Sequence, residues 1–274
     1  MRTVKIENIK SFVVISDVHL REPQDDNYKI FIDYLDKIKQ EHYNSRIDAI
    51  IFLGDIFDFI TVSKKFFIKL WSEAFFRIKE LKNLGIKTFF LEGNHDFGFE
   101  HFHTSDLDEI FNYYGDFILE IDHPELGKTI FRHGDNLICL PSYQKPRAFF
   151  KSYLFQKFAN LLFPGFLMHF ICTRYAKRSR NKGETYNALT APFLRNCLDN
   201  YYKVYAETNK IQINTLILGH IHVYLNTGYN NVKLLVGPDW FSNPNYFIYY
   251  SATNNTRIFF NSKDVKQFDI MNSK

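Results

Sequence analysis

The sequence predicts an α/β fold, in which short buried strands alternate with helices. Five apolar runs rich in β-branched and aromatic residues are typical of buried strands. Stretches with apolar residues at helical spacing separate several of these runs, which gives the strand–helix–strand order of a parallel sheet. Each run leads into a turn rich in Asp, Asn, His and Gly. Because such folds bind ligands at the carboxyl ends of their strands, we expect the five turns to converge.

The strands and their turns follow in regular order along the chain. They are residues 12–15 before Asp17 and His19, 49–53 before Asp55, 88–91 before Asn94, His95 and Asp96, 129–131 before His133, and 215–218 before His220 and His222. The turns are almost evenly spaced as far as His133, but the interval from His133 to His220 is more than twice as long. We therefore expect one domain over residues 1–274, with a cap inserted between two core strands at about 140–190.

Two long helices are predicted between the first three strands. Apolar residues recur at helical spacing over residues 29–42 and again over 65–84, and Gly85 suits the end of the second helix. After His222 come further strand-like runs, which suit a second sheet built of hairpins. These runs are residues 233–236, 246–250 and 257–260.

The composition limits the classes of protein to which the chain can belong. With 46% hydrophobic residues the chain can bury a sizeable core, and its net charge of +4 is too mild to indicate nucleic-acid binding by itself. The three cysteines are far apart and form no CxxC pair, so they predict neither a zinc site nor a disulfide framework. The apolar run at 12–15 is too short for a secretory signal, which favours a cytoplasmic protein.

One apolar segment, residues 153–172, raises the question of a membrane-spanning helix. It contains Lys157, Asn160, Pro164 and His169, a combination that a spanning helix would rarely carry. We therefore interpret the segment as soluble or interfacial.

The polar turns together predict a centre for two metal ions. Their carboxylates, imidazoles and single amide suit Mn²⁺, Fe²⁺ or Zn²⁺ better than Ca²⁺, which prefers oxygen ligands alone. Seven ligands are too many for one ion, and a bridging carboxylate lets two ions approach to about 3.5–4 Å. One such turn by itself is often an ordinary turn, but five in series are hard to produce by chance. The candidate ligands are Asp17, His19, Asp55, Asn94, His133, His220 and His222.

This ordered set of turns resembles the calcineurin-like metallophosphoesterase superfamily. The matching blocks are Asp17-x-His19, Gly54-Asp55, Gly93-Asn94-His95-Asp96, His133-Gly134-Asp135 and Gly219-His220-x-His222. The resemblance implies two packed mixed β-sheets flanked by helices, here with a helical cap insertion. It also implies that Asp17, His19 and His222 hold one metal, that Asn94, His133 and His220 hold the other, and that Asp55 bridges them.

The same resemblance implies a hydrolase that cleaves phosphoric ester or anhydride bonds. His95 would contact the phosphate and protonate the leaving group, and Asp96 would orient His95. Asp135 would not bind metal but would lie next to the metal-binding residues and help to position them. We expect Mn²⁺ as the metal, with Fe²⁺ and Zn²⁺ as alternatives. The two ions would polarise the phosphoryl oxygens and lower the pKa of a bound water.

The inserted segment is at once aromatic, aliphatic and basic, and it allows three interpretations. The first is a helical hairpin that packs on the core, which is the commonest fate of such helices. The second is an acyl-chain pocket or a membrane-surface anchor, with Lys and Arg facing anionic headgroups. The third is a nucleic-acid surface, which the many aliphatic side chains disfavour because they do not stack on bases. We expect no stable nucleic-acid partner.

The order of blocks and the cap resemble the bacterial UDP-2,3-diacylglucosamine diphosphatases of lipid A synthesis. The similarity rests on Tyr143-Gln144-x-x-Arg147 after the His133 block, and on the basic stretch that contains Ser179. It implies substrate-binding roles for Tyr143, Gln144, Arg147 and Ser179. The chain departs from many members of that family at residues 223–224, which are Val-Tyr instead of Arg-Pro. It also has His95 where closely similar members often have arginine.

This narrower resemblance predicts a pyrophosphohydrolase for a nucleotide-linked acylated sugar, acting at the inner face of the membrane. The products would be UMP and 2,3-diacylglucosamine 1-phosphate. One alternative is a phosphodiesterase or phosphatase for a soluble substrate, or an exonuclease that acts on DNA. Another is a binding module, whose metal site is a scaffold and whose cap docks a partner.

Overall fold

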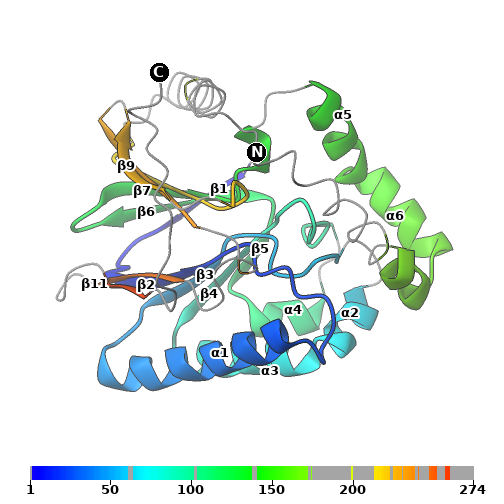
Figure 1. The fold of residues 1–274 in the computed structure, drawn as a ribbon, viewed down its shortest axis with the longest axis horizontal. Coiled ribbons are helices and arrows are strands. Elements are labelled where there is room, and N and C mark those ends of the chain that lie inside the picture. Colours follow the sequence, from blue (N-terminus) through cyan, green and yellow to red (C-terminus); the bar gives the residue numbers. More distant parts are fainter. Residues whose placement is uncertain are drawn as a thin grey trace.

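The computed structural model describes residues 2–60, 64–101, 104–137, 141–171, 174, 199, 213–222, 225–229, 231–237, 240, 247–251 and 257–259. Its centre is a pair of six-stranded sheets, which lie as two layers with helices below the lower one (Figure 1). This α/β arrangement confirms the predicted fold class. The division into one domain with a cap stays a prediction.

The lower sheet, called sheet I here, contains the first three predicted strands side by side. Its strands run β12-β11-β2-β3-β4-β5, and β2 to β5 are parallel because helices connect them. Their bounds are β2 Ser11–Ile15, β3 Ala49–Phe52, β4 Lys87–Leu91, β5 Tyr113–Gly115, β11 Phe247–Ser251 and β12 Arg257–Phe259.

The upper sheet, called sheet II, contains the two later strands that carry polar turns. Its order is β1-β6-β7-β8-β10-β9, and β7 and β8 are parallel neighbours. The bounds are β1 Arg2–Ile6, β6 Phe117–His123, β7 Gly127–Arg132, β8 Thr215–Leu218, β9 Leu225–Tyr229 and β10 Val232–Val236.

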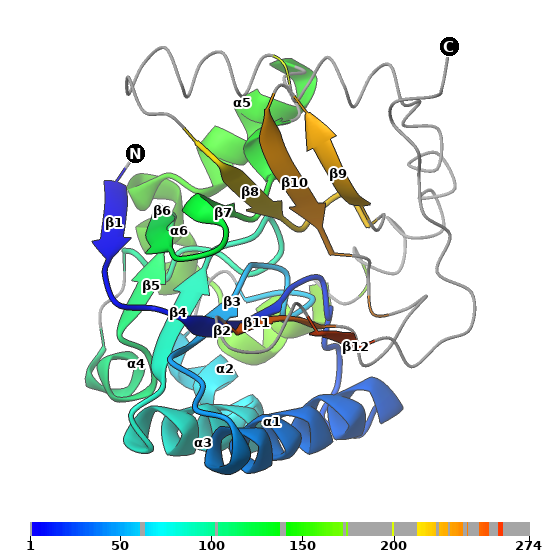
Figure 2. The same ribbon diagram turned by 90° about the vertical axis from the view of Figure 1, so that its left-hand side faces the viewer.

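The sequence suggested that the last strands form a sheet of their own. In the structure they do not. Strands β9 and β10 pair as an antiparallel hairpin at the edge of sheet II, while β11 and β12 pair at the edge of sheet I (Figure 2). Strand β10 pairs with β8 and β11 pairs with β2, so each hairpin extends an existing sheet. Strand periodicity alone cannot choose between two sheets, because both present apolar inner faces.

Four helices pack under sheet I, and further helices lie to one side of the sandwich (Figure 1). Trp71 interrupts the single helix expected over 65–84; its buried ring lies 5.4 Å, centroid to centroid, from both Tyr28 and Phe57. The helices under the sheet are α1 Asp26–Asn44, α2 Lys64–Leu70, α3 Ser72–Asn83 and α4 Ser105–Ile110. The lateral ones are the 3-10 helix η1 Asp135–Leu137, α5 Pro141–Phe150, α6 Tyr153–Leu162 and the helical residues 165–171.

Two apolar cores hold these layers together. Phe12 and Val14 of β2 face the core between the sheets, and Val13 and Ile15 face the core under sheet I. Alternate side chains of a strand point to opposite faces, so β2 has to be apolar on both. This burial fixes the carboxyl ends of the strands, where the polar turns lie.

Most of the described residues of the predicted insertion are helical. Helices α5 and α6 stand beside the sandwich instead of under a sheet (Figure 1). None of the helices in the part of the chain that the structure describes is long and apolar enough to cross a membrane. Hereafter, the cap means the predicted insertion at about 140–190, of which the structure describes residues 141–171 and 174.

Candidate metal centre

The polar turns have an unusual backbone at the predicted ligands themselves. Asp17, His19, Asp55, His220 and His222 all have φ between 52° and 66°, although none of them is glycine. L residues rarely adopt this left-handed conformation, and such strain gathers at functional sites where the surroundings enforce it. Apart from Asn8 and Asn231, the non-glycine residues with positive φ in the described part of the chain are all candidate ligands.

Backbone hydrogen bonds tie the turns of the two sheets to one another. The amide of Asp17 donates to the carbonyl of Gly54 at 3.1 Å, and that of His19 donates to Asp55 at 2.9 Å. Across the sheets, the amide of His220 donates to the Asp17 carboxylate at 2.9 Å. These bonds offset the strain and hold the ligands in place before any metal binds.

Two glycines are needed because ligands lie directly against the backbone. A Cβ atom at Gly219 would come within 2.5 Å of Asp17 Oδ2, and one at Gly93 would overlap Asp55 Oδ1. Only a residue without a side chain leaves room for these carboxylates.

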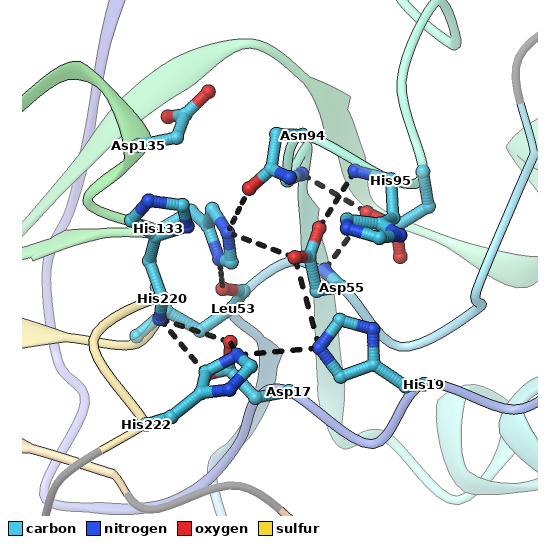
Figure 3. Close-up of polar contacts among 12 residues, drawn as sticks. Asp17, His19, Leu53, Asp55, Asn94, His95, His133, Asp135, His220 and His222 are labelled. Carbon is cyan, nitrogen blue, oxygen red and sulfur yellow. Dashed lines mark hydrogen bonds and ion pairs between the residues drawn. The ribbon is translucent and has the colours of Figure 1, made fainter. Parts of the chain in front are cut away.

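The seven candidate ligands come together as two groups with Asp55 between them (Figure 3). In the first group, His222 Nε2 lies 3.2 Å from Asp17 Oδ1 and 3.3 Å from His19 Nε2. The donor atoms of Asp17, His19 and His222 lie within 4.8 Å of one another, as do those of Asp55, His133 and His220. Two clusters of this size suit two ions.

The second group contains His133, His220, Asn94 and Asp55. His133 Nε2 lies 3.3 Å from Asn94 Oδ1 and 3.4 Å from Asp55 Oδ2. The same Asp55 oxygen lies 3.9 Å from His19 Nε2 of the first group, as a bridging carboxylate requires. His133 Nδ1 lies 2.8 Å from the Leu53 carbonyl, which fits a donated hydrogen bond that leaves Nε2 for a metal.

The carboxylates around His133 keep a proton on its imidazole, which a metal ion would displace. Burial alone would lower the pKa of His133, but Asp55 and Asp17 outweigh it and raise that pKa to about 10. Burial and the neighbouring His133 lower the pKa of His220 to about 3, so this imidazole is neutral and able to bind metal. Burial would raise the pKa of Asp55, yet His133 and His95 hold it well below its usual range.

Residues 10–224, more than half of the chain, match the model of the calcineurin-like phosphoesterase family. The chain belongs to this family. It is therefore a hydrolase that acts on phosphoester bonds, and its fold implies a centre for two divalent metal ions. This set of carboxylate, imidazole and amide donors, of which Asp17, His19, Asp55 and His133 are buried, fits such ions by its chemistry.

Solved structures with similar folds include several other phosphoesterases. An archaeal phosphodiesterase is 13% identical over 91% of this chain and 99% of its own, with a TM-score of 0.43. A dimetal phosphatase from Danio rerio is 13% identical over 91% of this chain and 95% of its own, with a TM-score of 0.45. At these values the likenesses carry no argument about the substrate. No match was found among the curated proteins.

In this calcineurin-like phosphoesterase, His95 lies beside the ligands, and Asp58 holds its ring. His95 Nδ1 is 2.8 Å from the carbonyl oxygen of Asp58 and 3.3 Å from its carboxylate. Burial would lower the pKa of His95, but Asp55 and Asp58 raise it to about 9. An imidazole held in this way is suited to donate a proton to a leaving group.

Asp96, which we expected to orient His95, has another place. Its carboxylate accepts hydrogen bonds from the amides of Asp55 at 2.9 Å, Ile56 at 2.7 Å and Gly93 at 3.0 Å. Asp96 therefore joins the turns after β3 and β4, and the carboxylate beside the ring is Asp58. Asp58 lies in the same sequence block as Asp55. That it contacts His95 follows only from the path of the turn in the structure.

The predicted substrate residues of the cap are only partly described. Gln144 Nε2 donates to the Asp135 carbonyl at 3.3 Å, and Arg147 forms an ion pair with the Asp135 carboxylate. The side chain of Tyr143 and the whole of Ser179 lie outside the described residues. The substrate-binding roles of these four residues stay predictions.

Proposed function

We propose that this phosphoesterase hydrolyses the pyrophosphate bond of UDP-2,3-diacylglucosamine, giving UMP and 2,3-diacylglucosamine 1-phosphate, at the inner face of a membrane. The observation that carries the proposal is the outward-facing apolar surface of the cap. Mn²⁺ is the metal we propose, because the mixed nitrogen and oxygen donors suit it.

Helix α6 has its apolar face turned away from the protein. Leu154, Phe158 and Leu161 are 77%, 62% and 82% exposed, whereas Gln156 is fully buried. A helix that packs on a soluble core has the opposite arrangement, with polar residues outside. The α6 face therefore supports an apolar ligand or surface as its partner.

The exposed apolar surface continues on both sides of α6. Phe149 and Phe150 precede it, and Phe166 and Phe170 follow it, all of them exposed. Single exposed apolar side chains are ordinary, but a contiguous group of this kind marks a site of interaction.

The charges of the cap suit an anionic lipid surface. Residues 137–183 contain no Asp or Glu. Lys157 Nζ lies 5.8 Å from the centre of the Tyr153 ring, and the Arg174 guanidinium lies 4.3 Å from the centre of the Phe170 ring. Cations beside exposed aromatic rings are typical of proteins that bind at the boundary of headgroups and acyl chains.

The chain's own residues can carry the proposed hydrolysis. When bound, the two metal ions supply the polarisation of the phosphoryl oxygens and a water of lowered pKa. Water provides the new oxygen on one phosphorus, the bridging P–O bond breaks, and His95 gives its proton to the leaving phosphate. Asp58 keeps the His95 ring in place during this transfer.

The test is a turnover assay with Mn²⁺ on three substrates: UDP-2,3-diacylglucosamine, its deacylated analogue and an aryl phosphodiester. We expect release of UMP from the acylated substrate and slow turnover of the other two. Equal or better activity on the aryl ester, with none on the lipid, would overturn the substrate proposal and favour a soluble phosphodiester.

A second assay tests the membrane surface with the matched apolar variants that the chain offers. Serine at Leu154, Phe158 and Leu161 should weaken binding to vesicles of phosphatidylglycerol and phosphatidylcholine by at least about tenfold, because three buried contacts are lost. Tyr43→Ser with Phe76→Ser is the control, since these exposed rings lie on α1 and α3. Equal binding of both variants would contradict the proposal.

A further inference from the structure

A buried ionic cluster joins the cap to the sandwich beside the candidate ligand His133. Asp135 opens η1, and its side chain is 1% exposed. Its Oδ2 atom forms an ion pair with Arg147 of α5 and lies 3.5 Å from Lys151 Nζ. In Figure 3 the Asp135 side chain lies apart from Asp55.

The acidic groups around these two cations belong to the sandwich. Arg147 Nη2 lies 3.6 Å from Asp116, which also lies 3.6 Å from Arg132. The buried carboxyl of Glu92 interacts electrostatically with Lys151, although burial raises the pKa of Glu92. Asp135 thus faces both cap cations, Arg147 and Lys151.

Most of the α5 side chains that the structure describes are exposed. These are Lys145, Pro146, Ala148, Phe149 and Phe150. The polar contacts of the helix reach the sandwich: Gln144 and Arg147 meet Asp135, Arg147 also lies 3.6 Å from Asp116, and the carbonyl of Lys151, just after the helix, lies 2.9 Å from His101 Nε2. A helix held by charge is displaced when one charge is removed, since the remaining buried charges are left uncompensated.

We propose that Asp135 is a positioning residue, which fixes α5 and the apolar cap face relative to the metal centre through Arg147 and Lys151. Only Gly134 separates Asp135 from His133, so the same short turn carries a candidate ligand and the anchor of the cap. A substrate that contacts both the cap and the metals requires this fixed relation. That consequence for catalysis rests on the proposed function, while the attachment itself does not.

The test measures amide hydrogen exchange in the full chain with Mn²⁺. We expect Asp135→Asn and Lys151→Met each to speed exchange over residues 141–162 by about tenfold or more, with α1 unchanged. Lys157→Met is the matched control, because Lys157 is an exposed cap lysine without a partner in this cluster, and its exchange should equal that of the wild type. In the double variant Asp135→Asn/Lys151→Met, the increase in exchange should be smaller than the combined increases of the two single variants, because both substitutions break the same interaction.

The Mn²⁺ content and a kinetic split separate this role from support of His133. We expect Asp135→Asn to bind two Mn²⁺ ions and Lys151→Met to raise KM for the acylated substrate more than it lowers kcat. Loss of Mn²⁺ from Asp135→Asn with wild-type exchange in the cap would overturn the proposal, as would wild-type exchange in Lys151→Met. If the acylated substrate proves wrong, the exchange result still decides the attachment.

Discussion

The metal centre and the cap are built on opposite physical plans. The centre draws its ligands from strands buried on both faces, and backbone bonds hold those ligands at strained φ angles. The cap exposes its apolar side chains, buries Gln156 and meets the sandwich through charges. The difference teaches that the places of the candidate ligands depend on strand burial and backbone hydrogen bonds, whereas the place of the cap depends on charged side chains.

The largest expected effect comes from removing a ligand in the rigid region. Asp55→Ala or Asn94→Ala should reduce turnover to the level of the buffer blank, because Asp55 lies between both groups and Asn94 completes the second. The far-ultraviolet spectrum and metal content check that the fold survives while the ions are lost. Normal activity in either variant would contradict the assignment of the centre.

The sequence predicts that the candidate ligands converge, as the structure places them, but not what surrounds them. All seven candidate ligands follow strands, and parallel strands bring their carboxyl ends to one edge, so their convergence could be predicted. The left-handed φ angles of five of them could not, because an Asp or His in the sequence does not indicate that conformation as glycine does. The role of Asp58 depends on a ring from another turn, and no local pattern encodes it.

The cap shows a different limit of sequence analysis. Helical periodicity predicts that Leu154, Phe158 and Leu161 share a face, but it does not tell whether the face points inward or outward. The break at Trp71 has a similar cause, because packing against Tyr28 and Phe57 overrides a continuous helical pattern. Tertiary contacts decide both features, and they join residues far apart in the chain.

A smaller effect should distinguish the two aspartates near His95. His95→Gln should lower kcat by about 10²–10⁴-fold as expected for loss of a general acid, and Asp58→Asn by about 10–100-fold as expected for loss of its support. Both losses should shrink for a substrate with an aryl leaving group, which needs no proton. Asp96→Asn should lower Tm instead, because Asp96 joins two turns through backbone amides. The assignment of Asp58 fails if Asp58→Asn has the kcat of the wild type. It fails all the more if the kcat of Asp96→Asn falls only for substrates whose leaving group needs a proton.

The smallest expected effect is a proton released when the centre binds metal. Without metal the pKa of His133 is raised to about 10, so this imidazole is protonated at pH 8. A metal ion needs its neutral form, and binding should release about one proton from it. Titration calorimetry with Mn²⁺ in two buffers of different ionisation enthalpy measures that number, and His133→Asn should lower it.

The Leu154→Ser/Phe158→Ser/Leu161→Ser variant should release as many protons as the wild type, since the cap holds none of the seven candidate ligands. A change in that variant would mean that the outer face of the cap and the metal centre are electrostatically coupled, against the separation of roles argued above.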